Sequence, residues 1–330
     1  MKFGAVPVGA AEGAILAHSL RLPSGVLKKG RVLSADDIAV IAQAGHAAII
    51  VAQMGPSDVE ENTAAALLAQ AIAPDLEAAH LRIADPFTGR VNLYARRAGV
   101  TVLDVEAVHA LNRVNPLITL ATPRAYTRVA AGALVGTVKI ISYGVPADDL
   151  KAACDAAAGA LRIQPAVLPD ATLILTDLPG AVDSAKGEAS VAGRLDALGV
   201  HLTETLRVPH APKAVSEAVE RAKGALVLIL TASATSDPAD VAPMGLTLAG
   251  GTLIHFGMPV DPGNLLFLGD HNTRPVIGLP GCARSPALNG ADWVMERVLC
   301  GIPVTSGDIA AMGVGGLLKE IKTRPQPREG

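Results

Sequence analysis

The second half of the sequence predicts an α/β domain with a mostly parallel sheet in three layers, and the first half predicts smaller mixed α+β units. Strand and helix patterns alternate from residue 148 onward, which is typical of parallel strands joined by helices. The run at 225–231 is strongly apolar, as expected for a central strand covered on both faces. Residues 1–147 lack this alternation, so we expect a separate architecture there.

Residues 1–55 predict a small α+β unit of short strands and one helix. Ser34 is a favourable helix N-cap, and Asp36 and Asp37 would fall in the first turn, so a helix is expected up to about Ala44. Gly45 is expected to end that helix, and 46–51 follows as a strand.

Residues 56–147 predict a mixed α+β middle unit. An Ala- and Leu-rich helix is expected over 60–80, and a hairpin over 83–94 because turn residues lie at its centre. A second helix over 104–112 and strands over 119–124 and 135–142 complete this unit.

Residues 148–318 carry the alternating pattern of the α/β domain. The expected elements are a helix at 148–159, a strand at 171–176, a helix at 188–198 ended by Gly199, a strand at 201–208, a helix at 213–222 and a strand at 225–231. Residues 319–330 are polar and contain proline, which predicts a linker-like tail.

Composition argues against several classes of function. The net charge of -3 gives no electrostatic reason to expect nucleic acid or an anionic membrane as a partner. The longest apolar runs fall far short of the ~20 residues that cross a bilayer, and the first residues lack a secretory signal, so we expect a cytoplasmic protein. The histidines and cysteines show no zinc-ligand spacing, and Cys154 and Cys300 are expected to be buried apolar residues.

The first candidate site is the loop from Thr231 to Asp240, Thr-Ala-Ser-Ala-Thr-Ser-Asp-Pro-Ala-Asp. It follows the central strand, and ligands of parallel sheets bind at the carboxyl ends of strands. Its hydroxyls, carboxylates and backbone N–H groups suit a phosphate, a polar heterocycle or Mg²⁺. The alternative is a plain Ser/Thr/Asp cap before a helix near Asp240, and composition alone favours that alternative.

Further candidates lie at another strand end and at two turns. Thr176 and Asp177 end an earlier buried strand, and the turns at Pro262-Gly263 and Pro280-Gly281 expose backbone N–H groups. Taken singly, each is also explained as an ordinary cap or turn. The sequence has no Gly-x-Ser-x-Gly elbow, no Gly-Lys-Ser/Thr phosphate loop and no Gly-x-Gly-x-x-Gly after a strand, which argues against the common hydrolases, NTPases and dinucleotide-binding enzymes.

Taken in order, these motifs resemble the molybdopterin-binding domain of molybdenum-cofactor biosynthesis proteins, which molybdopterin adenylyltransferase and molybdopterin molybdenumtransferase share. The resemblance covers about 171–316, and the segments 11–18, 27–30 and 36–41 resemble the opening of proteins related to the molybdenumtransferase. It implies a cofactor-binding role for five sets of residues: Thr176 and Asp177; Lys186 and Gly187; Thr231, Ala232, Ser233, Ala234, Thr235, Ser236, Asp237 and Asp240; Pro262, Gly263 and Asn264; and Pro280, Gly281 and Cys282.

The resemblance also implies ligands and partners. The expected ligand is molybdopterin or molybdenum cofactor, with Mg²⁺ and ATP or CTP in addition if the protein is a transferase. Asp177 and Asp240 are then the expected catalytic and metal-binding carboxylates. Relatives of this fold form dimers or trimers, so a homo-oligomer is expected. Some bacterial relatives carry a cytidylyltransferase-type nucleotidyltransferase domain after this unit, and the linker-like tail agrees with a chain that continues past Gly330.

The sequence departs from the family pattern in two of these motifs. Ala232 and Ser233 stand where the family has two glycines, and Asn264 stands where a Lys or a small residue is usual. A Cβ at a position that needs positive φ costs on the order of 1 kcal/mol or more, and it also takes space from a ligand. Two hypotheses follow: a transferase of cofactor biosynthesis, or a non-catalytic module that senses or delivers the cofactor and supports a partner domain.

Overall fold

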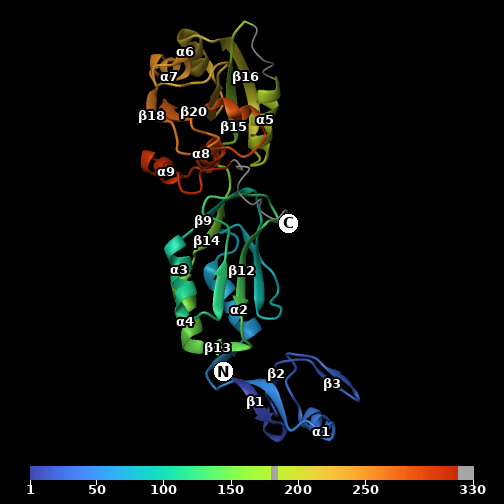
Figure 1. The fold of residues 1–330 in the computed structure, drawn as a ribbon. Coiled ribbons are helices and arrows are strands. Elements are labelled where there is room, and N and C mark those ends of the chain that lie inside the picture. Colours follow the sequence, from blue (N-terminus) through green and yellow to red (C-terminus); the bar gives the residue numbers. More distant parts are fainter. Residues whose placement is uncertain (180–184, 319–330) are drawn as a thin grey trace. The chain divides into compact units, whose positions relative to one another are not determined.

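The computed structural model describes residues 1–179 and 185–318, and the chain divides into two compact units (Figure 1). The first unit holds residues 1–96, 101–125 and 131–163. The second unit holds residues 97–100, 126–130 and those from Gln164 onward. The finer division predicted from the sequence, with boundaries after residues 55, 147 and 318, stays a prediction.

The first unit begins with a small antiparallel sheet and one helix that share a core. β5 (Ala48–Gln53) lies between β1 (Lys2–Pro7) and β2 (Ile15–Leu16), and β3 (Leu20–Leu22) forms a hairpin with β4 (Gly25–Leu27). The predicted cap Ser34 starts α1 (Ala35–Gln43) by accepting a hydrogen bond from the Asp37 backbone N–H. Gly45 follows with a φ of 85°, so the predicted helix and strand are confirmed.

A four-stranded antiparallel sheet forms much of the remaining first unit. Its strands, in spatial order, are β10 (Ile118–Ala121), β12 (Leu134–Ile140), β8 (Arg90–Ala95) and β7 (Leu81–Ile83). The pairing of β7 with β8 confirms the predicted hairpin. The other elements in this part of the chain are β6 (Asp58–Glu60), α2 (Glu61–Ile72), β9 (Gly99–Leu103), α3 (Val105–Val114), β11 (Arg128–Val129), β13 (Gly144–Pro146), α4 (Ala147–Ala156) and β14 (Leu161–Gln164).

Helix α2 ends well before the predicted residue 80. Its C-cap Ala73 has φ −139° and ψ 79°, outside the helical region. Ala73 is followed by Pro74, and the proline ring excludes the helical conformation from the residue before it. The predicted extension of this helix beyond Ile72 was therefore wrong, because one proline outweighs the helix propensity of the alanines around it.

The second unit is built on a six-stranded sheet with the order β16-β15-β17-β20-β19-β18. Its strands are β15 (Asp170–Asp177), β16 (His201–Pro209), β17 (Leu226–Leu230), β18 (Thr252–Phe256), β19 (Phe267–His271) and β20 (Arg274–Leu279). The pairs from β16 to β20 are parallel, whereas β19 pairs antiparallel with both of its neighbours. The unit is therefore mixed α/β, with one reversed strand that the sequence did not predict.

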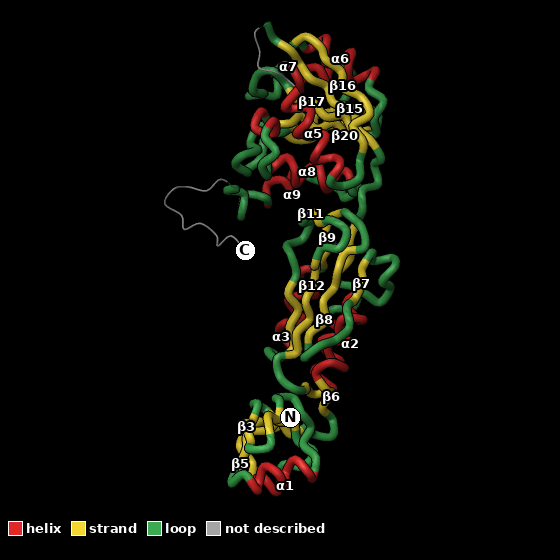
Figure 2. The backbone as a smooth tube through the Cα atoms, turned by 90° about the vertical axis from the view of Figure 1, so that its right-hand side faces the viewer, coloured by secondary structure: helices red, strands yellow, loops and turns green. Residues whose placement is uncertain are grey.

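Helices cover both faces of this sheet (Figures 1 and 2). Residues of α5 (Ala185–Asp196) and α8 (Gly290–Leu299) share one core with the sheet, and residues of α6 (Pro212–Arg221) and α7 (Val241–Leu248) share the other. Along β17, Leu228 faces the first core and Val227 and Ile229 face the second. Every residue of β17 is buried, which explains its unbroken apolar sequence. A last helix, α9 (Ser306–Ala311), follows α8.

Phe267 and Gly278 form a close pair between β19 and β20. They face each other in register, and Phe267 is fully buried. A Cβ on residue 278 would lie 1.9 Å from an atom of the Phe267 ring. Gly278 is therefore required because the aromatic ring takes the space of a side chain there.

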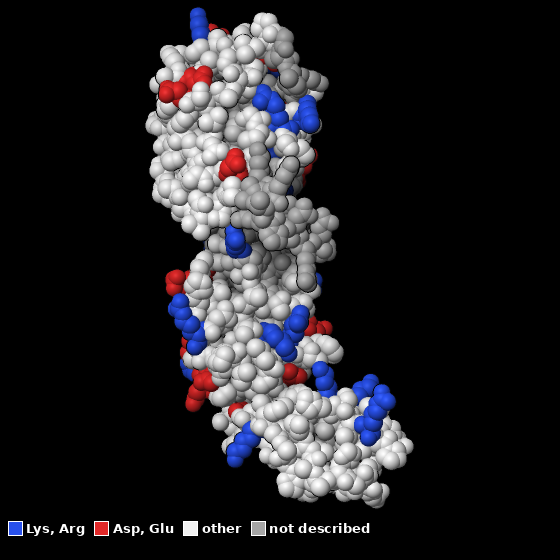
Figure 3. Space-filling model, in the orientation of Figure 1, with Lys and Arg blue, Asp and Glu red and all other residues white. Residues whose placement is uncertain are grey.

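No described helix is long and apolar enough to cross a membrane. Figure 3 shows basic and acidic side chains interspersed on one face of the described residues, between wide uncharged areas.

Candidate functional site

The predicted site motifs come together at one edge of the six-stranded sheet. Leu230 of β17 pairs with Leu175 of β15 and with Leu279 of β20. Because these strands are parallel, the next residues lie at the same edge of the sheet: Thr176 near the end of β15, Thr231 just after β17 and Pro280 just after β20. The connection from β18 to β19 lies at this edge too, since the first residue of β19, Phe267, pairs with Gly278 of β20.

Thr176 links the ends of three strands. Its hydroxyl oxygen accepts a hydrogen bond from the Ala232 backbone N–H (2.8 Å) and lies 2.9 Å from Nδ1 of His210. If the Thr176 hydroxyl donates its proton to Nδ1 of His210, the proton of the neutral imidazole lies on Nε2. The backbone N–H of His210 in turn donates to the carbonyl oxygen of Asp177 (3.0 Å).

The loop after β17 is held by its own polar side chains. The buried Thr231 hydroxyl donates to the carbonyl oxygen of Ser233 (2.6 Å) and lies 3.2 Å from the hydroxyl of Thr235. Asp240 accepts from the backbone N–H groups of Val241 (2.7 Å) and Ser236 (3.1 Å), so it caps α7. The helix-cap alternative for Asp240 is what the structure contains.

The exposed part of this loop consists of Ser233, Ala234 and residues 236–239. These residues offer two hydroxyls, one carboxylate and backbone N–H groups to solvent. Within the described residues, neither unit contains a group of three His, Cys, Asp or Glu side chains that could hold a metal ion. Mg²⁺ binding at Asp177 and Asp240 therefore stays a prediction.

Ala232 and Ser233 adopt ordinary backbone conformations. Neither is among the described non-glycine residues with positive φ, which are His80, Thr88, Tyr126, Asn272 and Thr273. The loop therefore stores no left-handed strain at the two positions where glycine was expected. The two side chains instead reduce the space above the loop, because each adds a Cβ atom that glycine lacks.

Arg284 places a positively charged side chain at this edge of the six-stranded sheet. It ends a short 3-10 helix, Gly281–Arg284, and its Nη2 donates to the carbonyl oxygen of Thr231 (2.5 Å). Burial lowers the pKa of the Arg284 guanidinium. Gly187 in the first turn of α5 gives this side chain room, because a Cβ there would lie 3.3 Å from Cγ of Arg284 and 3.0 Å from Leu230.

A buried ion pair holds the segment from 281 to 287. Nε of Arg194 on α5 lies 2.5 Å from the Asp292 carboxylate on α8, and both side chains are 8% exposed. The other guanidinium nitrogens donate to the carbonyl oxygens of Ala283, Ser285 and Ala287. One arginine therefore fixes the path of the chain after β20.

The Pro262 turn lies beside the first turn of α8. The carbonyl oxygen of Pro262 accepts from the Gly290 N–H (2.8 Å), and the Asp261–Pro262 peptide bond is cis. Gly263 has a φ of 146°, and a Cβ there would lie 2.9 Å from the Gly290 backbone. Asn289 donates from Nδ2 to Sγ of Cys282 (3.0 Å), which connects this turn to the Pro280–Cys282 motif.

Other predicted residues take simpler positions. Asn264, Lys186 and Cys282 are exposed, and Lys186 lies in the first turn of α5. Cys300 is buried as expected, and burial raises the pKa of its thiol to about 11. Cys154 is only partly buried. The predicted tail at 319–330 lies outside the described residues.

The sequence did not identify three residues of this edge: His210, Arg194 and Arg284. The spacing of the histidines gave no zinc site. His210 nevertheless directly follows a strand of the predicted sheet, a position at which ligand-binding side chains occur. A charged residue such as Arg194 in a helix packed on the sheet would have been a usable signal for a buried ion pair.

Three comparisons with known proteins place the chain only coarsely. A family model described as a domain of unknown function (DUF8806) matches residues 5–53. No curated protein matches. Similar solved structures include a molybdenum cofactor biosynthesis protein from Pyrococcus furiosus, with 13% identity and a TM-score of 0.26, where the alignment covers 92% of this chain and 66% of that one.

A second similar structure is a molybdopterin biosynthesis MoeA protein from Pyrococcus horikoshii, with 12% identity and a TM-score of 0.29, covering 93% of this chain and 75% of that one. Another structure of a MoeA protein from Pyrococcus horikoshii has 11% identity and a TM-score of 0.22, covering 85% and 69%. TM-scores of this size carry no argument about function.

Proposed function

We propose that the protein binds molybdopterin or molybdenum cofactor at the carboxyl edge of the six-stranded sheet and acts in molybdenum-cofactor biosynthesis. The observation that supports this most is the connection between separate motifs of the family pattern. Thr176 bonds to Ala232, Arg284 bonds to Thr231, and Asn289 bonds to Cys282. Motifs far apart in sequence thus share one surface.

The polar groups of this edge suit a ligand with a phosphate and a flat heterocycle. The N–H groups and hydroxyls of residues 233–236 would hold the phosphate, and Arg284 would supply positive charge, since among the described residues it donates one hydrogen bond, to Thr231. His210 would offer Nε2–H to an anionic group. The exposed Asp177 carboxylate would accept N–H groups of the pterin ring.

A transfer reaction at this edge would depend on positioning, without a protein nucleophile. Because the described residues gather no cluster of metal ligands, no step of the proposal passes through Mg²⁺. ATP or CTP as a second substrate, a homo-oligomer and a following nucleotidyltransferase domain remain proposals that the family resemblance implies, as does a cytoplasmic location.

The second candidate function is a non-catalytic module that senses or delivers the cofactor. Ala232 and Ser233 favour it, because their Cβ atoms take space where the family has glycine. The module would retain the phosphate contacts of the loop while the ligand sits farther from it. Binding of the pterin without turnover of ATP or CTP would favour the module over the transferase.

Titration calorimetry of the purified protein with molybdopterin tests the proposed site. We expect Arg284→Met to weaken binding by about tenfold to a hundredfold, because a hydrogen bond to a charged group contributes about 1.5–3 kcal/mol. Arg221→Met is the matched control, since exposed Arg221 ends α6 at the opposite edge of the sheet. Absence of pterin binding to the unaltered protein would refute both cofactor functions. Equal losses of affinity in Arg284→Met and Arg221→Met would show that the pterin does not bind at this edge of the sheet.

Substitutions of Asp240 and Asp177 should show which of the two carboxylates caps a helix and which contacts the ligand. Asp240→Ala is expected to lower the free energy of unfolding by about 1 kcal/mol, because two backbone N–H groups lose their acceptor. Asp177→Ala should change it by less than about 0.5 kcal/mol, since the side chain is exposed, and should weaken pterin binding. Urea denaturation and the same titration measure both. If Asp240→Ala kept its stability but no longer bound the pterin, Asp240 would be a ligand contact and not only a helix cap.

A further inference from the structure

The first unit contains a cavity of about 400 Å³ on residues that the proposed pterin site does not use. It is lined by segments far apart in the chain, among them residues 17–18, 29–30, Glu61, Lys139 and 141–143. The hydroxyl of Tyr143 donates to the carbonyl oxygen of Ala17 (3.0 Å), which joins two of these segments. Its volume falls within the range of ordinary small-molecule sites, about 300–1,000 Å³.

Glu61 presents a carboxylate to this cavity. Its side chain is 17% exposed, and its closest cation, Nζ of Lys139, lies 4.0 Å away, which is beyond hydrogen-bonding distance. Lys139 donates instead to the carbonyl oxygen of Thr88. Among the described residues, no donor forms a hydrogen bond with the Glu61 carboxylate.

Burial raises the pKa of the Glu61 carboxyl, and the charges of Lys139 and Lys29 partly oppose this effect. The Glu61 carboxylate is partly buried and faces the cavity, so a cationic or N–H group of a ligand would be a favourable partner for it.

The cavity also has a cationic side and an apolar wall. Lys29 and His18 line it together with Lys139. Phe3 and Ile141 line it as well, and these two side chains are 57% and 56% exposed, which leaves apolar surface uncovered. The Phe3 ring meets the His18 ring edge to face, with 6.5 Å between centroids.

We propose that this cavity binds a small zwitterion, namely an α-amino acid with an apolar side chain. Its ammonium group would lie on Glu61, its carboxylate on Lys29 and Lys139, and its side chain on Phe3 and Ile141. The ammonium and carboxylate groups of such a ligand are attached to one carbon, and the oppositely charged groups of Glu61 and Lys139 in the cavity lie 4.0 Å apart.

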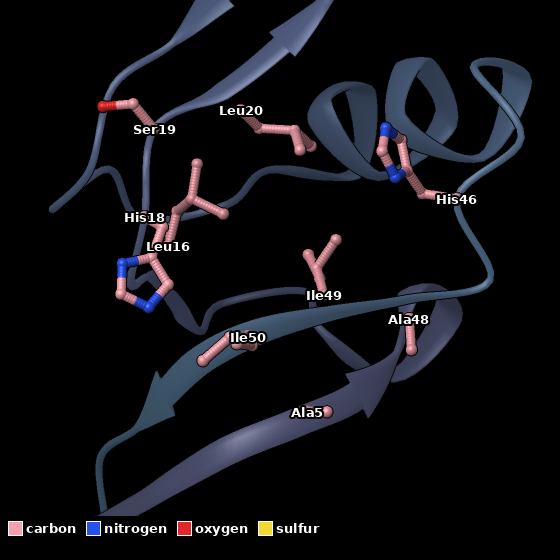
Figure 4. Close-up of a pocket in the computed structure, with 9 residues that line it drawn as sticks. All are labelled: Ala5, Leu16, His18, Ser19, Leu20, His46, Ala48, Ile49 and Ile50. Atoms are coloured by element: carbon pink, nitrogen blue, oxygen red, sulfur yellow. The ribbon is translucent and has the colours of Figure 1, made fainter.

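A neighbouring hollow in the same unit supplies a contrast. It has a volume of about 240 Å³, and Figure 4 shows His18 and His46 on opposite sides of it, with Ala48 and Ile50 on a strand between them. Its lining includes no Lys, Arg, Asp or Glu, so it lacks the paired charges that recognise a zwitterion. His46 lines only this second hollow of the two.

Calorimetric titration of the full chain with three probes tests the proposal. L-phenylalanine is expected to bind, whereas 3-phenylpropionate, which lacks the ammonium group, and phenethylamine, which lacks the carboxylate, should each bind at least about tenfold more weakly. Glu61→Gln and Lys29→Met should each lower the affinity for L-phenylalanine by about tenfold, and His46→Ala should leave it unchanged.

Several outcomes would overturn the proposal. They are no binding of L-phenylalanine at millimolar concentration, equal binding of 3-phenylpropionate, or unchanged affinity in Glu61→Gln. Lys29 is exposed, so its variant keeps the test valid even if Glu61→Gln fails to fold. Pterin titration of the same variants should match the unaltered protein, which keeps this site separate from the one on the sheet.

Discussion

Replacing Arg194 by Met is expected to lower the free energy of unfolding by about 3–5 kcal/mol, as for other buried ion pairs from which one partner is removed. The substitution leaves the Asp292 carboxylate buried without its cation. It also removes donors from the carbonyl oxygens of Ala283, Ser285 and Ala287. Urea denaturation followed by circular dichroism measures the effect.

Two further variants identify the cause of this loss. Arg194→Lys keeps the charge but lacks the planar set of donors, so it should recover only part of the stability. Changing Asp292 to Asn in the Arg194→Met background should recover some of it too, because no buried charge is then left unpaired. A loss below about 1 kcal/mol in Arg194→Met would show that water replaces the guanidinium at these carbonyl oxygens.

Glu296 is expected to make the protein less stable as the pH rises. Its side chain on α8 is buried, and this burial raises the pKa of the carboxyl from 4.5 to about 7, although the charge of Arg128 opposes the increase. Between these two values the folded protein holds a proton that the unfolded chain has released. Stability from this group is therefore complete below pH 4.5 and is lost as the pH rises to about 7.

The size of this effect follows from the two pKa values. A pKa difference between 4.5 and about 7 corresponds to about 3 kcal/mol of stability. Glu296→Gln should remove most of the slope between pH 5 and 7 in a series of urea denaturations. Glu188→Gln is the control, because the Glu188 carboxylate is partly exposed and pairs with Arg207 at the surface. An unchanged slope in Glu296→Gln would assign the pH dependence to another group.

Elements with a strong local pattern could be predicted from the sequence. The apolar run of β17, the cap Ser34 of α1 and the acidic first-turn residue Asp37 could be predicted because their causes lie within a few residues. The extension of α2 past Ile72 was wrong, since the effect of Pro74 was given too little weight. The reversed strand β19 was not predicted, because strand direction depends on how distant segments pair.

The candidate site was predictable to a similar degree. That Thr176, Thr231 and Pro280 meet follows from the rule that parallel strands end at one edge. The pairing of Arg194 with Asp292 joins residues 98 positions apart, and no local pattern predicts it. The position of His210 directly after a predicted strand could have marked it as a candidate, but its contact with the hydroxyl of Thr176 on the neighbouring strand follows from the folded sheet alone.

Because the ring of Phe267 fills the space beside Gly278, the residues at these two positions restrict each other's size. A larger residue at 278 can be tolerated only in a chain whose residue 267 is smaller, so the two are expected to change together among related sequences. Since Gly278 lies just before Leu279 and Pro280, an uncompensated change would also displace the turn that begins at Pro280. The size of one phenylalanine on a neighbouring strand therefore limits which sequences can form the turn that begins at Pro280.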